Sequence, residues 1–406
     1  MTKIHALAWL GLCLAWGSTI LAGVDEGLFR DLTPDRARQA AAEAGKNLVL
    51  IDFYTVWCGP CKKLDETTWK DQGVRDWLAR EGICLKIDAE KEEALAEKYR
   101  INVYPTVLLL RPDGTEVDRL VGYRDAKTFL ADATEAMAGN DSLSRARAKL
   151  QGENANDPML RMNYGDALAQ KDRPEDALSE YLWCFDHGLE HSRGFTGVRL
   201  SFLLGKILQL AKANPAALDE LRKRRDAAGQ AIEAGKADFD QAMSFTALNS
   251  NLREPDRTLV LFDRIKGDRS KPELIRNYLF DQSLDPLLKA KRYKEIVEEV
   301  DPRAKIRESI EQYQRNMTFV PKDKSLRDYM KQRVSVEGAK YYEALLGTGN
   351  PTSAAEIAAI LTNFDPIGAY KPLIAAARSA DDAQAAEALS KAARNPAGPE
   401  IPKESP

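Results

Sequence analysis

The sequence of 406 residues predicts an α/β domain followed by a longer region made of helices. From about residue 25 to residue 139, apolar runs of strand length alternate with amphipathic stretches of helix length, as in α/β domains. From residue 141 to about residue 394, the strand-like runs fade and amphipathic helical patterns continue between short polar breaks. We therefore expect a sheet domain of about 115 residues, a normal domain size, and then an all-α domain.

Local signals predict the elements of the α/β domain in chain order. Thr33 supplies a capping hydroxyl and Pro34 suits a first turn, so a helix is expected to begin there. The run NLVLIDFY (residues 47–54) is almost entirely apolar, which indicates a central strand buried on both faces. A bent helix is expected from about Cys58 to Arg80. The remaining predicted elements are a strand at 83–88, a helix at 90–100, a hairpin of strands 106–111 and 115–123 around a Pro-Asp-Gly turn, and a helix at 125–137.

One segment of the helical region, residues 163–184, resembles a tetratricopeptide repeat. The small, small, aromatic and small packing positions of that repeat are matched, in this order, by Gly165, Ala177, Tyr181 and Cys184. Later segments match the pattern only loosely. The expectation is therefore a degenerate array of helical hairpins over residues 141–394, and an irregular helical domain is the alternative. The Pro-rich tail at residues 395–406 is expected to be disordered.

The N-terminus has the pattern of a secretory signal. Lys3 is followed by an apolar stretch over residues 6–16 and by small residues at Ala22 and Gly23. The apolar stretch is shorter than the roughly 20 residues that a membrane-spanning helix needs. A lipoprotein signal at Cys13 is rejected because Leu12 stands where a small residue is required. We expect a cleaved signal peptide at residues 1–22 and a periplasmic or secreted protein.

Charge and cysteine usage exclude several function classes. The formal net charge is −3, and basic and acidic residues are interleaved without a long Lys/Arg run, so no nucleic-acid partner is expected. Of the five cysteines, four remain after removal of the signal, too few for a disulfide-stapled scaffold in a chain of this length. Cys84 lies in an apolar strand and is interpreted as an inert core thiol.

Two cysteines stand close together in YTVWCGPCKK (residues 54–63), a spacing that is compatible with a metal site, a structural disulfide or redox chemistry. A structural zinc site needs four ligands, and the α/β region contains no histidine or second cysteine pair to supply them. A purely structural disulfide across so short a loop constrains the unfolded chain little. Redox chemistry fits best, because Cys58 follows a predicted strand and opens a helix, where unpaired N–H groups and the helix dipole favour a thiolate. Cys61, one turn further in, is expected to be better shielded and to resolve a mixed disulfide.

The segments LIDFYTVWCGPCKK and YRINVYPTVLLLRPDGTEVDRLVGY resemble the thioredoxin family, over residues from about 45 to 137. The resemblance implies the thioredoxin fold, a central mixed sheet with flanking helices. It also implies a buried carboxylate at Asp52 with Lys86 as its neighbour. The segment KKLDETTWKDQGVRDWL resembles more closely the C-terminal thioredoxin-like domain of bacterial thiol:disulfide interchange proteins.

The resemblance also implies a role for each residue of the site. Cys58 is the attacking thiolate and Cys61 the resolving thiol. Asp52 accepts the proton of Cys61, and its alternative role is that of a structural carboxylate paired with Lys86. A cis Tyr104–Pro105 bond would expose backbone to an extended substrate segment. The residues expected to bind substrate are Trp57, Gly59, Pro60, Tyr104, Pro105, Thr106 and Gly122.

A second group of candidate ligands lies in the helical region. Cys184, His187 and His191 have a spacing that resembles that of metal ligands. Gly188 is expected to interrupt the helix that would align them, and only three candidates are present. We interpret this segment as a helix end, and no metal site is expected anywhere in the chain.

The sequence therefore predicts a thiol:disulfide oxidoreductase that reduces protein disulfides and uses no cofactor besides its cysteine pair. Gly59 and Pro60 match reducing thioredoxins. No flavin or nicotinamide motif is present, so a separate thiol electron donor is expected, such as a membrane-embedded thiol carrier. A further protein partner is expected at the helical domain. The alternative is an interaction protein in which the helical array is the main functional part and the thioredoxin domain only binds partners.

Overall fold

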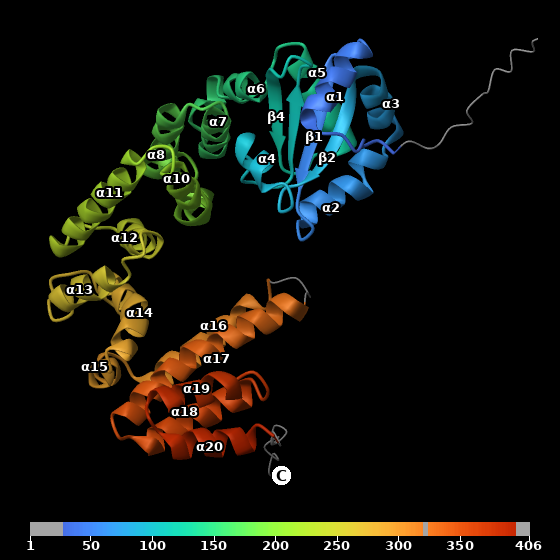
Figure 1. Cartoon of the computed structure of the whole chain (residues 1–406). Helices are drawn as coiled ribbons and strands as arrows, with labels where there is room; N and C mark the ends of the chain where they lie inside the picture. Colours follow the sequence, from blue (N-terminus) through green and yellow to red (C-terminus); the bar gives the residue numbers. More distant parts are fainter. Residues whose placement is uncertain (1–26, 320–323, 395–406) are drawn as a thin grey trace, which may run out of the picture. The chain divides into compact units, whose positions relative to one another are not determined.

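A computed structural model describes residues 27–319 and 324–394 of the chain. The chain divides into two compact units, of which the first ends at Ser192 and the second begins at Arg193. Figure 1 shows the elements of both units along the chain. The expected signal peptide at 1–22 and the expected tail at 395–406 lie outside the described residues.

The first unit is built on a mixed sheet of four strands in the order β2-β1-β3-β4. Strand β1 pairs in parallel with β2 and antiparallel with β3, and β3 pairs antiparallel with β4. The predicted sheet with flanking helices is thus confirmed. The strands are β1 (Leu48–Tyr54), β2 (Gly82–Asp88), β3 (Thr106–Leu110) and β4 (Glu116–Val121).

Strand β1 lies in the centre and is buried on both faces, as its apolar run predicted. Successive side chains of a strand point to opposite faces. Val49, Ile51 and Phe53 belong to a core that includes residues of α1 (Pro34–Glu43) and α4 (Glu93–Lys98). Leu48 and Leu50 belong to a second core, with residues of α2 (Gly59–Glu66), α3 (Gln72–Glu81) and α5 (Ala126–Met137) (Figure 1).

The prediction of one bent helix from Cys58 to Arg80 is wrong. The segment forms α2, a 3-10 turn at Thr68–Lys70 and then α3. The hydroxyl of Thr68 donates to the carbonyl of Arg124 (2.6 Å), and the carboxylate of Asp71 accepts from the N–H of Val74 (3.0 Å). Asp71 therefore caps a new helix, which a side chain of this type does well. The predicted start at Thr33 is confirmed, because its hydroxyl caps α1.

Three further helices belong to the first unit, although a boundary was expected near residue 140. They are α6 (Ser142–Lys149), α7 (Pro158–Gln170) and α8 (Pro174–His191), with a 3-10 turn at Gly152–Asn156. Lys171 explains part of the difference, since its Nζ pairs with Asp141 (2.9 Å) and donates to the carbonyl of Val117 (3.5 Å) on β4. The first compact unit therefore contains the sheet domain and these three helices, and it ends at Ser192.

Helices α7 and α8 form a hairpin whose interior uses the residues of the repeat-like pattern. Gly165 faces the ring of Tyr181, where an added Cβ would lie 2.6 Å from Cε1. Ala177, Tyr181 and Cys184 are buried. The hydroxyl of Tyr181 donates to Asp166 (2.7 Å) across the hairpin. The two helices approach so closely here that a side chain larger than that of Gly165 would collide with Tyr181. That this hairpin is a tetratricopeptide repeat stays a prediction.

Every regular element in the described part of the second unit is helical, as predicted. Successive helices pack in pairs, including α11 with α12, α13 with α14, α17 with α18 and α19 with α20. A continuous apolar core runs from Ala228 to Ala386. Within the described ranges, no helix combines the length and hydropathy that a membrane span requires. The bounds are Arg193–Phe195 (3-10), α9 Thr196–Val198, Arg199–Leu203 (π), α10 Leu204–Leu210, α11 Ala216–Glu233, α12 Phe239–Asn251, α13 Asp256–Ile265, α14 Glu273–Lys289, α15 Tyr293–Glu299, α16 Pro302–Asn316, α17 Lys324–Gly347, α18 Pro351–Phe364, α19 Tyr370–Ser379 and α20 Ala383–Ala392.

Candidate active site

Cys58 and Cys61 form a disulfide at the start of α2. Cys58 is the N-cap residue, its N–H donates to the carbonyl of Thr55 (3.2 Å), and its Sγ accepts from the N–H of Cys61 (3.1 Å). The expected place of Cys58, between a strand and a helix, is therefore confirmed. The expected difference in shielding is not seen, because the two residues are 3% and 2% exposed. What distinguishes Cys58 in this state is its position at the helix end.

An apolar rim lies next to the cysteine pair in the chain. Trp57 is 65% exposed, and its ring meets the ring of Tyr104 edge-on with centroids 6.0 Å apart. The indole N–H of Trp57 donates to Glu90 Oε1 (2.8 Å). Val56 and Val103 are also exposed beside these two aromatic residues in the sequence. Glu90, which was not predicted from the sequence, holds the indole of Trp57 through this hydrogen bond.

The loop that contains Tyr104 has the backbone that the resemblance implied. The Tyr104–Pro105 peptide bond is cis. The N–H of Gly122 donates to the carbonyl of Pro105 (2.8 Å), and Gly122 has a φ of +85°, which favours glycine. The hydroxyl of Thr106 donates to the carbonyl of Val103 (2.7 Å), and the Thr106 side chain is buried, so this hydroxyl is already occupied. Gly59 and Pro60 are exposed at the start of α2.

Asp52 takes an apolar position of strand β1. It lies on the same face of the strand as Leu48 and Leu50, and it is only 1% exposed. The strand register sets Lys86 of β2 beside it, and Lys86 Nζ lies 3.8 Å from Asp52 Oδ2. Trp69 Nε1 donates to the same oxygen (3.0 Å), whereas Oδ1 accepts no hydrogen bond from the residues that the structure describes. The carboxylate is thus buried and only partly compensated.

Burial is the main reason why the pKa of Asp52 rises, from 3.8 to about 6. The ammonium of Lys86 and the hydrogen bond from Trp69 act against this rise, and the carboxylate of Asp65 adds to it. Lys86 also forms an ion pair with Asp65, so it is shared between two carboxylates. A carboxyl group with this pKa changes its charge close to neutral pH, as a proton acceptor must.

Asp65 and Trp69 are functional candidates that the sequence analysis missed. They follow Cys61 by four and eight residues, and residues at this spacing share one face of a helix. The spacing is therefore a signal that could have placed them towards the sheet. In the structure α2 ends at Glu66, and Trp69 reaches the sheet from the following 3-10 turn.

The candidate metal ligands of the helical region are used in other ways. The thiol of Cys184 donates to the carbonyl of Pro158 (3.4 Å), and the ring of His191 stacks on Trp183 at 5.5 Å. The prediction that Gly188 interrupts this helix is wrong, because α8 is continuous from Pro174 to His191. Across the described ranges, no group of three or more His, Cys, Asp or Glu residues could hold a metal ion.

The two free thiols among the described residues are poor nucleophiles. Burial raises the pKa of Cys84, on β2, to about 12. Burial also raises the pKa of Cys184 to about 12. Because the thiolate is the reactive form, neither residue competes with Cys58 near neutral pH.

Comparisons with known proteins identify the sheet domain. Residues 34–135 match the family model of a thioredoxin-like domain. Thioredoxin from Chlamydia trachomatis serovar D is 38% identical over 93 residues, which cover 22% of this chain and 83% of that protein. This chain belongs to the thioredoxin family. Its thioredoxin-like domain has the fold and the cysteine pair of thiol:disulfide oxidoreductases.

Other relatives match the chain over a similar length. Thioredoxin-1 of Drosophila melanogaster is 37% identical over 68 residues, which are 17% of this chain and 61% of that protein, so the match spans less than two thirds of it. The C-terminal domain of DsbD from Neisseria meningitidis, solved in the reduced form, is 27% identical. That match covers 24% of this chain and 89% of the solved one, with a TM-score of 0.22.

The raised pKa of Asp52 predicts a pH-dependent gain in stability for Asp52→Asn. Between pH 3.8 and about 6, the folded chain holds a proton that the unfolded chain has lost. The free energy of unfolding therefore falls as the pH rises through this window, and above it the folded state carries the full cost of the buried charge. The variant is expected to be more stable than the wild type by about 3 kcal/mol at pH 8 and to differ little at pH 3.5.

Urea unfolding of the oxidised protein at a series of pH values checks this, followed by tryptophan fluorescence. The tryptophans of the described ranges all lie in the first unit, so they report on its unfolding. Asp65→Asn is the matched control, because it removes a partly exposed carboxylate from the same lysine. A gain for Asp52→Asn that does not change with pH, or an equal gain for the control, would contradict the assignment.

Proposed function

We propose that this protein is a periplasmic or secreted thiol:disulfide oxidoreductase that reduces protein disulfides. The observation that carries the proposal is the Cys58–Cys61 disulfide at a helix start, next in the chain to the exposed rim of Trp57. A buried carboxylate with a raised pKa, Asp52, belongs to the same domain. The signal-like N-terminus supports the compartment.

The reaction transfers two electrons from the protein to its substrate. In the dithiol form, the Cys58 thiolate attacks one sulfur of a substrate disulfide, a mixed disulfide forms, and the other substrate sulfur leaves as a thiolate. Cys61 then attacks Cys58 Sγ and releases the second substrate thiol. The substrate ends as a dithiol, and the protein ends with the Cys58–Cys61 disulfide seen in the structure.

The helix start favours the first step. The backbone N–H groups of the first turn and the helix dipole stabilise negative charge, and the Cys61 N–H already points at Cys58 Sγ. Asp52 serves the second step. With a pKa of about 6, its carboxylate is ionised at neutral pH and can accept the proton that Cys61 must lose before it attacks.

The rim and the loop with the cis bond are the proposed substrate groove. Trp57 and Tyr104 offer apolar surface, and the loop at Pro105, which the Gly122 N–H holds through the Pro105 carbonyl, is proposed to lie along an extended substrate segment. The cysteine pair stores the electrons, so no other cofactor is proposed. A thiol donor, such as a membrane-embedded thiol carrier, must reduce the disulfide after each turnover.

Substitution of the resolving cysteine is expected to trap substrates. In Cys61→Ser, the mixed disulfide on Cys58 has no internal thiol to release it, so bound proteins should stay attached until dithiothreitol is added. Affinity capture under denaturing conditions checks this. Cys58→Ser is the matched control, because it leaves Cys61 as the lone thiol, without the N-cap position, and should capture far less. Equal capture by both variants would contradict the assignment of the attacking cysteine.

The direction of the reaction is tested by the potential of the Cys58–Cys61 couple. Gly59 and Pro60 match the reducing thioredoxins, so we expect a value below about −220 mV, against about −120 mV for strong oxidants. Equilibration with glutathione buffers, followed by alkylation of free thiols, measures it. A potential close to that of the strong oxidants would assign the protein to disulfide formation instead of reduction.

We further propose that the helical region holds the protein whose disulfide is exchanged. In the second unit, α14, α16 and α17 line a groove of about 620 Å³, with charges of both signs and the rings of Tyr313 and Tyr341. Helical-hairpin arrays usually bind peptides or proteins on such surfaces. A partner bound to the same chain as the redox domain would react at a raised local concentration, without any change in the chemistry.

A shortened chain tests this second proposal. The chain is ended at Ser192, where the first compact unit ends, because an end at Gly139 would remove the helices that pack on β4. It should reduce a generic small disulfide at close to the full-length rate. In the Cys61→Ser background, its set of trapped proteins should shrink or change. If both lengths trap the same proteins equally well, the second unit does not select substrates.

A further inference from the structure

The end of strand β4 is joined to the loop that contains the cis bond. Gly122 directly follows β4, and its N–H donates to the carbonyl of Pro105 (2.8 Å). Apart from Gly122 and its two chain neighbours, no heavy atom of the described residues lies within 4 Å of the place where a Cβ of Gly122 would stand, so this backbone borders open space. The position of the Gly122 peptide therefore decides the shape of this side of the proposed groove.

The side chain of Arg124 folds back over this peptide. Its Nη1 donates to the carbonyl of Val121 (2.6 Å) and to that of Gly122 (3.3 Å). Its Nε donates to Asp132 Oδ2 of helix α5 (2.7 Å), and both side chains are 22% exposed. The fork of a guanidinium can hold two backbone carbonyls and a carboxylate together, which a single ammonium cannot do with the same geometry.

The same turn is tied to the segment that follows the cysteine helix. The carbonyl of Arg124 accepts from the buried hydroxyl of Thr68 (2.6 Å), and the hydroxyls of Thr67 and Tyr123 lie 3.2 Å apart. Lys63, two residues after Cys61, lies over the ring of Tyr123 at 4.3 Å. The turn thus connects the cysteine helix with the Pro105 loop.

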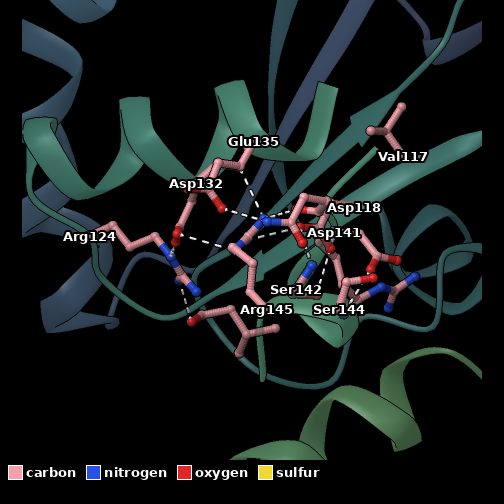
Figure 2. Close-up of polar contacts among 12 residues, drawn as sticks. Val117, Asp118, Arg124, Asp132, Glu135, Asp141, Ser142, Ser144 and Arg145 are labelled. Atoms are coloured by element: carbon pink, nitrogen blue, oxygen red, sulfur yellow. Dashed lines mark hydrogen bonds and ion pairs between the residues drawn. The ribbon is translucent and has the colours of Figure 1, made fainter. Parts of the chain in front are cut away.

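Helix α6 reaches this turn through one shared carboxylate, as Figure 2 shows. Asp132 binds Arg124 with one oxygen and Arg145 of α6 with the other, and the Arg145 Nε lies 3.5 Å from Oδ1. Arg145 Nη1 also donates to the backbone carbonyls of Asp132 (3.3 Å) and Asn140 (2.5 Å). Arg145 is 13% exposed, so little water competes for these contacts.

A buried carboxylate on β4 fixes the start of α6. Asp118 is 0% exposed and accepts from the N–H (2.9 Å) and the hydroxyl (2.6 Å) of Ser142. Arg145 Nη2 lies 3.2 Å from the Asp118 carboxylate (Figure 2). A buried carboxylate is stable only when it is paired and hydrogen-bonded. Asp118 has these partners when the start of α6 places Ser142 and Arg145 beside it. Arg145, and through it Asp132, is therefore held in a defined orientation.

We propose that Arg124 is a positioning residue for protein substrates, and that α6 holds it in place through Arg145 and Asp132. The proposal rests on the proposed function, because it concerns binding of a substrate segment beside Pro105 and Gly122. Loss of Arg124 frees the Gly122 peptide while the cysteine pair keeps its surroundings. Binding of an extended protein segment should weaken, whereas a small disulfide that reaches only the sulfurs should react as before.

The test compares Arg124→Met with the wild type in the full-length protein, with dithiothreitol as electron source. For insulin disulfides, the KM is expected to rise about tenfold with kcat nearly unchanged, the factor that corresponds to one lost hydrogen bond from a charged donor. 5,5′-Dithiobis(2-nitrobenzoic acid) is reduced by dithiothreitol itself, so it is mixed with pre-reduced protein from which dithiothreitol has been removed. The second-order rate constant of that single turnover should be unchanged, and so should the Cys58–Cys61 potential. Hydrogen exchange of the Gly122 amide should become faster.

Arg119→Met is the matched control, and Arg124→Lys the conservative variant. Arg119 lies on β4, which ends three residues before Arg124, and its side chain binds Glu116 and the carbonyl of Tyr99 and makes no hydrogen bond to Val121 or Gly122. It should leave the KM for insulin unchanged. Arg124→Lys keeps the charge opposite Asp132 and should give a smaller rise, and it serves as the test if Arg124→Met does not fold.

The link to α6 is tested by Arg145→Met, alone and combined with Arg124→Met. If Arg145 acts through Arg124, the single variant raises the KM for insulin and the double variant is no worse than Arg124→Met. Effects that multiply would overturn the link, and an unchanged KM and unchanged Gly122 exchange in Arg124→Met would overturn the positioning role. A wild type that reduces no disulfide would instead contradict the proposed function, and Gly122 exchange would still decide this inference.

Discussion

The first unit depends on a central strand that is buried on both faces and nevertheless contains a carboxylate. The register of β1 and β2 sets Lys86 beside Asp52, and the turn after the cysteine helix brings Trp69 to the same oxygen. These two contacts offset the burial only in part, which keeps the pKa of the carboxyl group near 6. An apolar residue at this position would make a more stable sheet. A carboxylate that is held there at a cost in stability is typical of a site selected for chemistry.

The cysteine pair and the proposed groove obtain their geometry from strand ends that meet at one edge of the sheet. Cys58 follows the end of β1, and Pro105 precedes the start of β3, which runs antiparallel to β1. The antiparallel pairing therefore brings the two loops to one edge of the sheet. Gly122, at the end of β4, lies at this edge for the same reason. Three segments distant in the sequence are thus placed by strand direction alone.

Much of this arrangement could be predicted from the sequence because it depends on local signals. The apolar run of β1, the Thr33 cap and the Cys-Gly-Pro-Cys spacing each act over a few residues, and each is found in the structure. The break between α2 and α3 was missed because it depends on a bond from Thr68 to Arg124, which is distant in the sequence.

The contacts around Asp118 were missed for a similar reason. Asp118 is one acidic residue of a predicted strand, and nothing near it in the sequence marks it as the partner of Ser142 and Arg145. The boundary expected near residue 140 followed the change from strand patterns to helix patterns. Ion pairs of Arg145 with Asp118 and Asp132 join α6 to the sheet domain across residue 140. The pattern of hydrophobic residues contains no information on such pairs.

The buried Asp118 carboxylate also limits how this chain can recombine with others. A gene fusion that replaced the sheet domain with another thioredoxin at residue 140 would leave Arg145 without its acidic partners. A fusion that kept the sheet but lost α6 would leave the Asp118 carboxylate without Ser142 and Arg145. Recombination that exchanges whole domains is therefore expected to preserve the fold only when the sheet domain and α6 are transferred together. The crossover must then leave these four residues on the same side: Asp118, Asp132, Ser142 and Arg145.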